Sequence, residues 1–214
     1  MFSRHRWSAC SVPVLAALVA ALVATPAMAA PSAGADPAVA AVFARFGAGT
    51  YTAADVKLVK SKPALARVVI DPGRTTSVVE DSNPELTAAL SGRGNRTADA
   101  LAETCGRRAV VITATSYLGD VIFQWRHDIG ICSDGTKVTR WNGRFDRLDY
   151  AQSIVELGAL TTDSASSVGG WGVTSVMQRT LALCVVNYGC YANRYPWSEI
   201  YIQADYHGQY WWGV

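Results

Sequence analysis

The sequence predicts a mainly β protein: an antiparallel β-sandwich-like domain at residues 104–214, preceded by a short Ala-rich, partly helical N-terminal region. Composition changes abruptly at Cys105. Six of the seven tryptophans follow it, whereas residues 31–103 hold only three aromatic residues, Phe43, Phe46 and Tyr51. Beyond Cys105, apolar and polar residues alternate in short runs separated by turn-forming residues. Many short strands of this kind are typical of antiparallel sandwiches and barrels.

The first 30 residues have the pattern of a secretory signal peptide. Arg4 and Arg6 form a basic start, an apolar run extends from Val12 to Ala24, and small residues end at Ala30. The apolar run is shorter than the roughly 20 residues that a spanning helix needs. We therefore expect cleavage near Ala30, a secreted extracellular product, and no membrane association after cleavage.

Charge gives no support for a nucleic-acid partner. Removal of residues 1–30 takes away two of the 19 basic residues and none of the 17 acidic ones, so the mature chain is formally neutral. No cluster of Lys and Arg interleaved with aromatic residues occurs elsewhere in the sequence. We expect no nucleic-acid binding.

Four cysteines remain after cleavage: Cys105, Cys132, Cys184 and Cys190. An even number in an oxidising compartment predicts two disulfides, for which three connectivities are possible. We favour Cys105 with Cys132 and Cys184 with Cys190, because this pairing closes each loop locally. The spacings are not those of a zinc site, and no metal or cofactor is predicted.

Residues 31–103 are expected to form a linker with short helices. The apolar run from Val39 to Phe46 suggests one or two helical turns. Thr52 and Asp55 have the spacing of a capping box, although Asp replaces the preferred Glu or Gln. Asn83-Pro84-Glu85 predicts a helix start, with the helix continuing to Leu90.

The domain at 104–214 contains four runs that predict strands. In the second run, Val121, Phe123 and Trp125 share one face, and Gln124, Arg126 and Asp128 share the other. Asp134-Gly135 predicts a type I′ hairpin turn, and Asn187 and Gly189 predict a turn after the third run. The runs cover residues 107–117, 121–129, 170–186 and 198–212, the last with a turn at His207-Gly208.

Cys132 is followed by Asp134-Gly135, Trp125 and Trp141 lie on either side of it, and Tyr195-Pro196-Trp197 opens the last predicted strand. Together these features resemble a group of small secreted, disulfide-containing β-rich proteins of Gram-positive bacteria with no characterised function. The resemblance covers about half of the chain and implies a β-sandwich-like fold and secretion, but no activity. The chain departs from the pattern at Ile131, which is not aromatic, and in its extra Cys184 and Cys190.

Catalytic patterns are weak, and the sequence leaves open whether the protein is an enzyme. Adjacent strand residues point to opposite faces, so His127 and Asp128 cannot hydrogen-bond to each other. We expect this pair to be solvent-facing or at an edge. An extracellular, glycan-directed hydrolase is the alternative function, with a carboxylate or His-carboxylate site drawn from Glu156, Glu199, Asp205 and His207, or from His127 with a distant acid.

An extracellular binding or interaction module, with a glycan or a cell-surface protein as partner, is the preferred hypothesis. Its candidate ligand surface is formed by Tyr206, Trp211 and Trp212 near the C-terminus. Adjacent tryptophans on a strand face opposite sides. We therefore expect one of Trp211 and Trp212 to be mostly buried and the other to be exposed, as a ligand contact.

Overall fold

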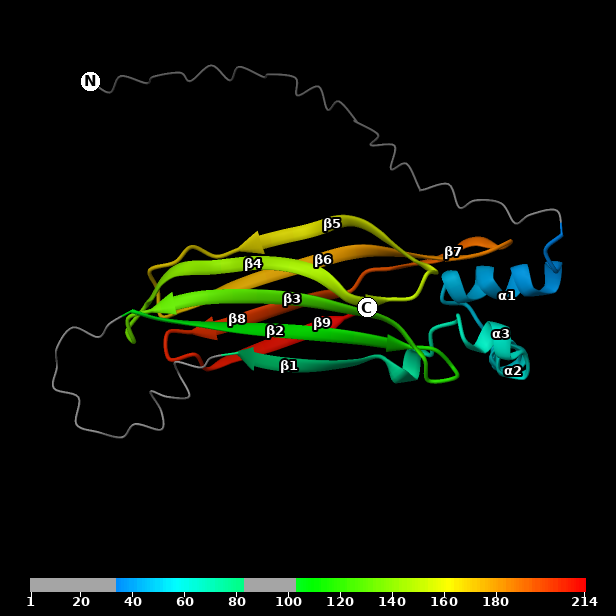
Figure 1. The fold of residues 1–214 in the computed structure, drawn as a ribbon, viewed down its shortest axis with the longest axis horizontal. Coiled ribbons are helices and arrows are strands. Elements are labelled where there is room, and N and C mark those ends of the chain that lie inside the picture. The colour runs from blue at the N-terminus through cyan, green and yellow to red at the C-terminus, as the bar shows by residue number, and fades with distance from the viewer. Residues whose placement is uncertain (1–33, 83–102) are drawn as a thin grey trace, which may run out of the picture.

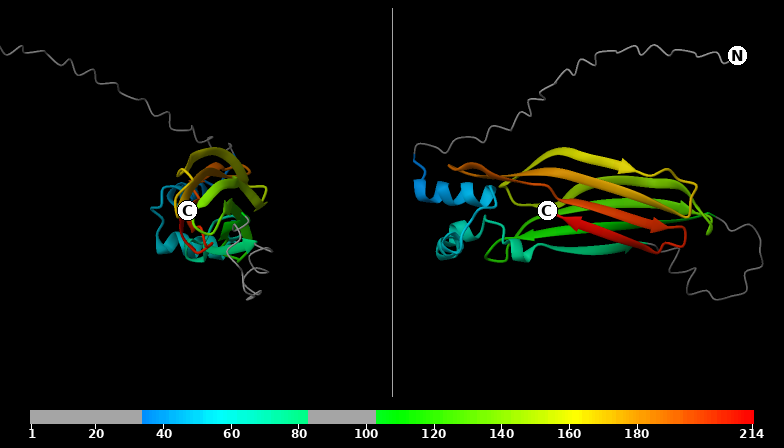
Figure 2. Two further views of the ribbon diagram at one scale, coloured as in Figure 1. Left: turned by 90° about the vertical axis from the view of Figure 1, so that its left-hand side faces the viewer. Right: turned by 180° about the vertical axis from the view of Figure 1, so that it is seen from behind.

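The structure is a computed structural model that describes residues 34–82 and 103–214. It contains two antiparallel sheets and a group of helices at one end (Figures 1 and 2). The predicted mainly β fold with a short helical region before the sheets is thus confirmed. The predicted signal peptide and the helix predicted from Asn83 to Leu90 lie outside the described residues. Within the described ranges, no helix is long and apolar enough to cross a bilayer.

The helical region begins with α1 (Pro37–Gly47), which is followed by α2 (Ala53–Ser61), α3 (Pro63–Ala66) and the 3₁₀ turn η1 (Pro72–Arg74). Asp36 caps α1 by accepting a hydrogen bond from the Ala38 amide. At the start of α2, the Thr52 hydroxyl accepts from the Asp55 amide, and the Asp55 carboxylate accepts from the Thr52 amide. The predicted capping box is therefore confirmed.

The first sheet has the strand order β1 (Thr76–Ser82), β2 (Thr104–Thr115), β3 (Val121–Ser133) and β4 (Val138–Ala151). The second has the order β5 (Val155–Ala165), β6 (Gly172–Val185), β8 (Trp197–Gln203) and β9 (Gly208–Gly213), and β7 (Gly189–Arg194) also pairs with β6. β1 falls within the segment that was expected to hold only linker and helices. It pairs with β2 over seven residues and extends the first sheet.

Apolar side chains from both sheets and from the helices form one core. β3 buries Phe123, Trp125 and Ile129, and β6 buries Met177 and Leu181. The helical region contributes to the same cluster through Val39, Val42, Phe43, Phe46 and Val59. α1 approaches β7 so closely that a Cβ added at Gly47 would lie 1.8 Å from the Tyr191 carbonyl oxygen. The helices therefore cover one end of the sandwich (Figure 2).

The two disulfides lie between neighbouring strands. Cys105 on β2 is bonded to Cys132 on β3, and Cys184 on β6 is bonded to Cys190 on β7. This is the local pairing favoured from the sequence. Asn187 and Gly189, in the turn enclosed by the second disulfide, both have positive φ, as a turn at this point requires.

The expected type I′ turn at Asp134-Gly135 is wrong. Gly135 has φ of 84°, but Asp134 does not have the positive φ that this turn requires. Instead, the Asp134 carboxylate accepts hydrogen bonds of 2.9 Å from the amides of Thr136 and Lys137. The loop is held by an aspartate side chain that mimics a backbone turn.

Candidate functional site

The structure separates the three aromatic residues that were expected to form the ligand surface. Tyr206 is buried at 8% exposure, and its hydroxyl donates a hydrogen bond to the Thr104 carbonyl oxygen. Trp211 on β9 is 46% exposed. Trp212 is half-buried and packs against the core. One indole therefore faces inward and its neighbour outward, as expected, and the Tyr206 ring belongs to the core instead of an exposed surface.

His127 occupies a buried position between the sheets, so its expected solvent-facing or edge placement is wrong. Its Nδ1 lies 2.7 Å from Ser198 Oγ on β8, and its Nε2 lies 2.8 Å from Ser175 Oγ on β6. Burial lowers its pKa to about 4, and the charge of Arg144 acts in the same direction. A neutral imidazole bonded to two serines and fully buried has no access to a substrate.

Asp128 points to the opposite face of β3, where its Oδ1 lies 3.3 Å from Arg107 Nε. The expectation that His127 and Asp128 cannot orient each other is thus confirmed. Two of the remaining candidates have structural surroundings. Asp205 accepts a turn hydrogen bond from the His207 amide, and Glu199 lies on β8 opposite Trp211. Glu156 on β5 lies near Cys184 and Cys190, whose bonded sulfurs offer no thiolate to a metal.

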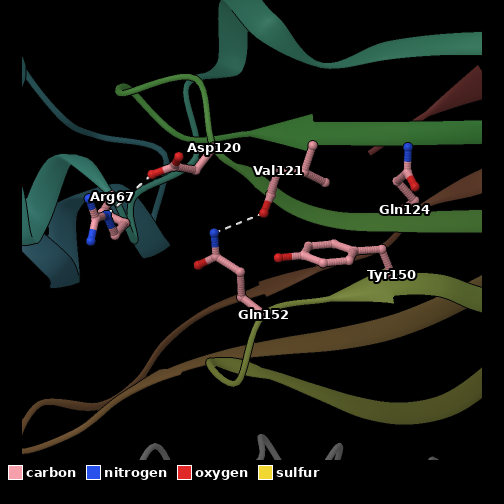
Figure 3. A pocket seen from close by; sticks show the side chains of 6 residues that line it. All are labelled: Arg67, Asp120, Val121, Gln124, Tyr150 and Gln152. Atoms are coloured by element: carbon pink, nitrogen blue, oxygen red, sulfur yellow. Dashed lines mark hydrogen bonds and ion pairs between the residues drawn. The ribbon is translucent and has the colours of Figure 1, made fainter.

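An open cavity of about 490 Å³ lies beside α3, at the end of the first sheet. We call it the Tyr150 groove. Because Phe123 and Trp125 point into the core, Gln124 between them points outward. Tyr150 lies opposite Gln124 on β4. The side chains that line the groove are Arg67, Asp120, Val121, Gln124, Tyr150 and Gln152 (Figure 3).

Hydrogen bonds fix the polar side chains of the groove in place. The Gln152 amide nitrogen Nε2 donates to the Val121 carbonyl oxygen at 2.8 Å, and its backbone amide donates to the Ile122 carbonyl oxygen at 2.9 Å. Figure 3 shows the amide oxygen of Gln152 on the side of Arg67. Gln124 is held by a 3.2 Å hydrogen bond to Thr113. The amide groups are therefore oriented before any ligand arrives.

The charged pair and the aromatic ring of the groove are both accessible. Arg67 Nε lies 3.3 Å from Asp120 Oδ2, with 68% and 46% of the two side chains exposed. Tyr150 is 47% exposed, and its hydroxyl points toward Gln152 (Figure 3). The lining thus presents an aromatic face, donors and acceptors, and two charges that offset each other. Such a lining suits an uncharged ligand with many hydroxyl groups.

The groove is not predicted by the sequence. Arg67 directly follows α3, Asp120 lies in the turn before β3, and the other four residues come from β3, the end of β4 and the position just after it, so no motif spacing connects them. A signal was present in β3, where the alternation places Gln124 on the outer face. Nothing in the sequence shows that Tyr150 lies beside it.

Comparisons of the chain with protein-family models, curated proteins and solved structures find no match.

Proposed function

We propose that the protein is an extracellular binding module and that its Tyr150 groove binds a glycan. The observation that carries this proposal is the exposed ring of Tyr150 in an open cavity lined by oriented amides and a neutral charge pair. A sugar ring has an apolar C–H face and a rim of hydroxyl groups. The face packs on an aromatic ring, and the hydroxyl groups hydrogen-bond to planar polar side chains.

The disulfides support an extracellular location for this function. Two disulfides persist in oxidising compartments and are rare where thiols are kept reduced. Secretion through the N-terminal leader is part of the proposal, because residues 1–30 lie outside the described ranges.

The hydrolase alternative has less support than binding. Glycoside hydrolysis needs two carboxylates, or a histidine and a carboxylate, that converge in one cleft. Glu156, Glu199, Asp205 and His207 do not line the Tyr150 groove, whose carboxylate, Asp120, is paired with Arg67. His127 is buried between two serines.

A pull-down with insoluble polysaccharides tests the proposal. The protein is incubated with cellulose, chitin and peptidoglycan, and Tyr150→Ala is compared with Trp211→Ala. The two rings are matched in exposure, at 47% and 46%, but lie on different sheets. We expect Tyr150→Ala to abolish retention on at least one polysaccharide, and Trp211→Ala to leave it unchanged.

Tyr150→Phe keeps the ring and removes the hydroxyl, and we expect it to retain part of the binding. Retention that depends on Trp211 and not on Tyr150 would move the site to β9 and refute the groove. If none of the three polysaccharides retains the protein, the proposal that it binds a glycan of this kind is refuted.

A further inference from the structure

A second cavity, of about 450 Å³, lies at the helical end of the molecule, and we call it the Trp212 cavity. Its walls come from segments that are far apart in sequence: the end of α1 and the loop after it, the segment before β1, the end of β7 and the end of β9. It shares no lining residue with the Tyr150 groove. Its volume falls within the range of small-molecule sites.

Three aromatic residues line this cavity: Phe46 and Tyr51 from the helical region, and Trp212 from β9. Tyr51 stacks on Phe46, with ring centroids 4.4 Å apart and an interplanar angle of 2°. Because Phe46 is buried in the core, this contact holds the Tyr51 ring in a fixed plane. Trp212, which is half-buried, packs against the same core from β9. The cavity therefore offers rigid aromatic walls to a flat apolar group.

Arg194 brings a guanidinium group to the same lining. Among the eleven arginines in residues 34–82 and 103–214, ten form ion pairs with carboxylates and Arg194 does not. Its guanidinium group therefore keeps donors that a bound anion can use.

We propose that the Trp212 cavity binds a small molecule with a flat apolar body and one carboxylate. A guanidinium group matches a carboxylate in shape and can donate two parallel hydrogen bonds to it. The partly apolar surroundings strengthen this attraction relative to bulk water. The apolar body packs against Trp212 and Tyr51 and removes from water the apolar area that those rings expose. This site is separate from the proposed glycan function.

The test compares an acid with its neutral amide. Binding of 2-naphthoate and of 2-naphthamide to the full chain is measured by calorimetry and by saturation-transfer NMR. The two probes share the flat apolar body and differ in charge. We expect 2-naphthoate to bind about tenfold more tightly, since a charge-assisted hydrogen bond has roughly that effect. Arg194→Gln should remove this preference and leave the affinity for the amide unchanged.

Arg140→Gln is the matched control, because Arg140 is partly exposed, is paired with Glu103 and lies outside the cavity. It should retain the preference for the acid. Equal affinity for the two probes, or an unchanged preference in Arg194→Gln, would overturn the role of Arg194. No saturation transfer to either probe at millimolar concentration would overturn the site itself.

Discussion

Arg179 on β6 and Asp146 on β4 form an ion pair that crosses from one sheet to the other, with Nη2 and Oδ1 2.7 Å apart. The Asp146 side chain is only 4% exposed and also accepts a hydrogen bond from Trp125 Nε1 at 2.8 Å. Burial opposes ionisation of Asp146, but the hydrogen bonds from Arg179 and Trp125 outweigh it, and the pKa is lowered. Both partners are therefore charged at neutral pH.

Arg179→Gln should lower the free energy of unfolding by about 3 kcal/mol, because it leaves the Asp146 carboxylate buried without its counter-charge. Urea denaturation at pH 7 measures this change. Arg74→Gln is the control, because Arg74 is 56% exposed and lies 3.6 Å from Asp71, and exposed pairs contribute less than about 1 kcal/mol. Equal losses in the two variants would contradict a buried cross-sheet pair.

His127 predicts a specific loss of stability in acid. Its pKa is lowered to about 4 in the folded state from the ordinary 6.5, mainly by burial. The unfolded chain therefore binds a proton at a higher pH than the folded chain does. The contribution of His127 to the free energy of unfolding is complete above about pH 6.5. About 3 kcal/mol of this free energy is lost as the pH falls to 4.

Asp146 and Asp163 raise the pKa of His127, and Arg144 lowers it. These neighbours change the pH range over which stability is lost, but the pKa of His127 stays below its ordinary value. The check is a series of urea midpoints from pH 7 to pH 4 for the native chain and for His127→Gln, which does not titrate. The native chain should lose more stability over this range than the variant does. Parallel curves would show that His127 is not a buried neutral group.

The two disulfides should differ in their effect on stability. The Cys105–Cys132 bond spans 27 residues and the Cys184–Cys190 bond spans 6. The two bonds restrict the unfolded chain, which stabilises the fold by about 3.5 kcal/mol for the longer loop and about 2.2 kcal/mol for the shorter. Cys184→Ser should therefore have a higher urea midpoint than Cys132→Ser. A reversed order would mean that local contacts, and not loop length, decide the effect.

Gly47 allows α1 to approach β7, and Gly47→Ala should destabilise the protein by about 1–3 kcal/mol through overpacking. The added methyl group would meet the Tyr191 carbonyl oxygen, which cannot move without shifting β7. Thermal unfolding measures the change. Gly73→Ala is the control, because the nearest contact of its added Cβ is at 3.4 Å, and its effect should stay within about 0.5 kcal/mol.

The sequence patterns that predicted structure correctly were local ones. The alternation in β3, the Thr52–Asp55 capping box and the turn at Asn187 each depend on neighbouring residues. The buried position of His127 could also have been predicted from the sequence, because the alternation that buries Trp125 puts His127 on the same face. Its polarity argued for solvent, and only the tertiary fold shows the two serine hydroxyl groups that satisfy its ring nitrogens.

Features that depend on distant segments could not be predicted in this way. β1 is a short run within a segment of otherwise helical and linker composition, and its pairing with β2 defines it as a strand. Tyr206 lies beside a predicted turn and was therefore expected at the surface. Its positive φ of 67° and its contact with Thr104 instead place it in the core. The Tyr150 groove and the Trp212 cavity each combine several segments, so neither has a linear signature.

Chemical-shift mapping of the backbone amides tests whether a glycan binds at the Tyr150 groove. The labelled protein is titrated with a soluble oligosaccharide of the polymer that retains it. The groove predicts saturable shifts concentrated at residues 120–124 and 150–152, and their loss in Tyr150→Ala. Shifts confined to residues 208–213 around Trp211, with the amides of the groove unchanged, would contradict it.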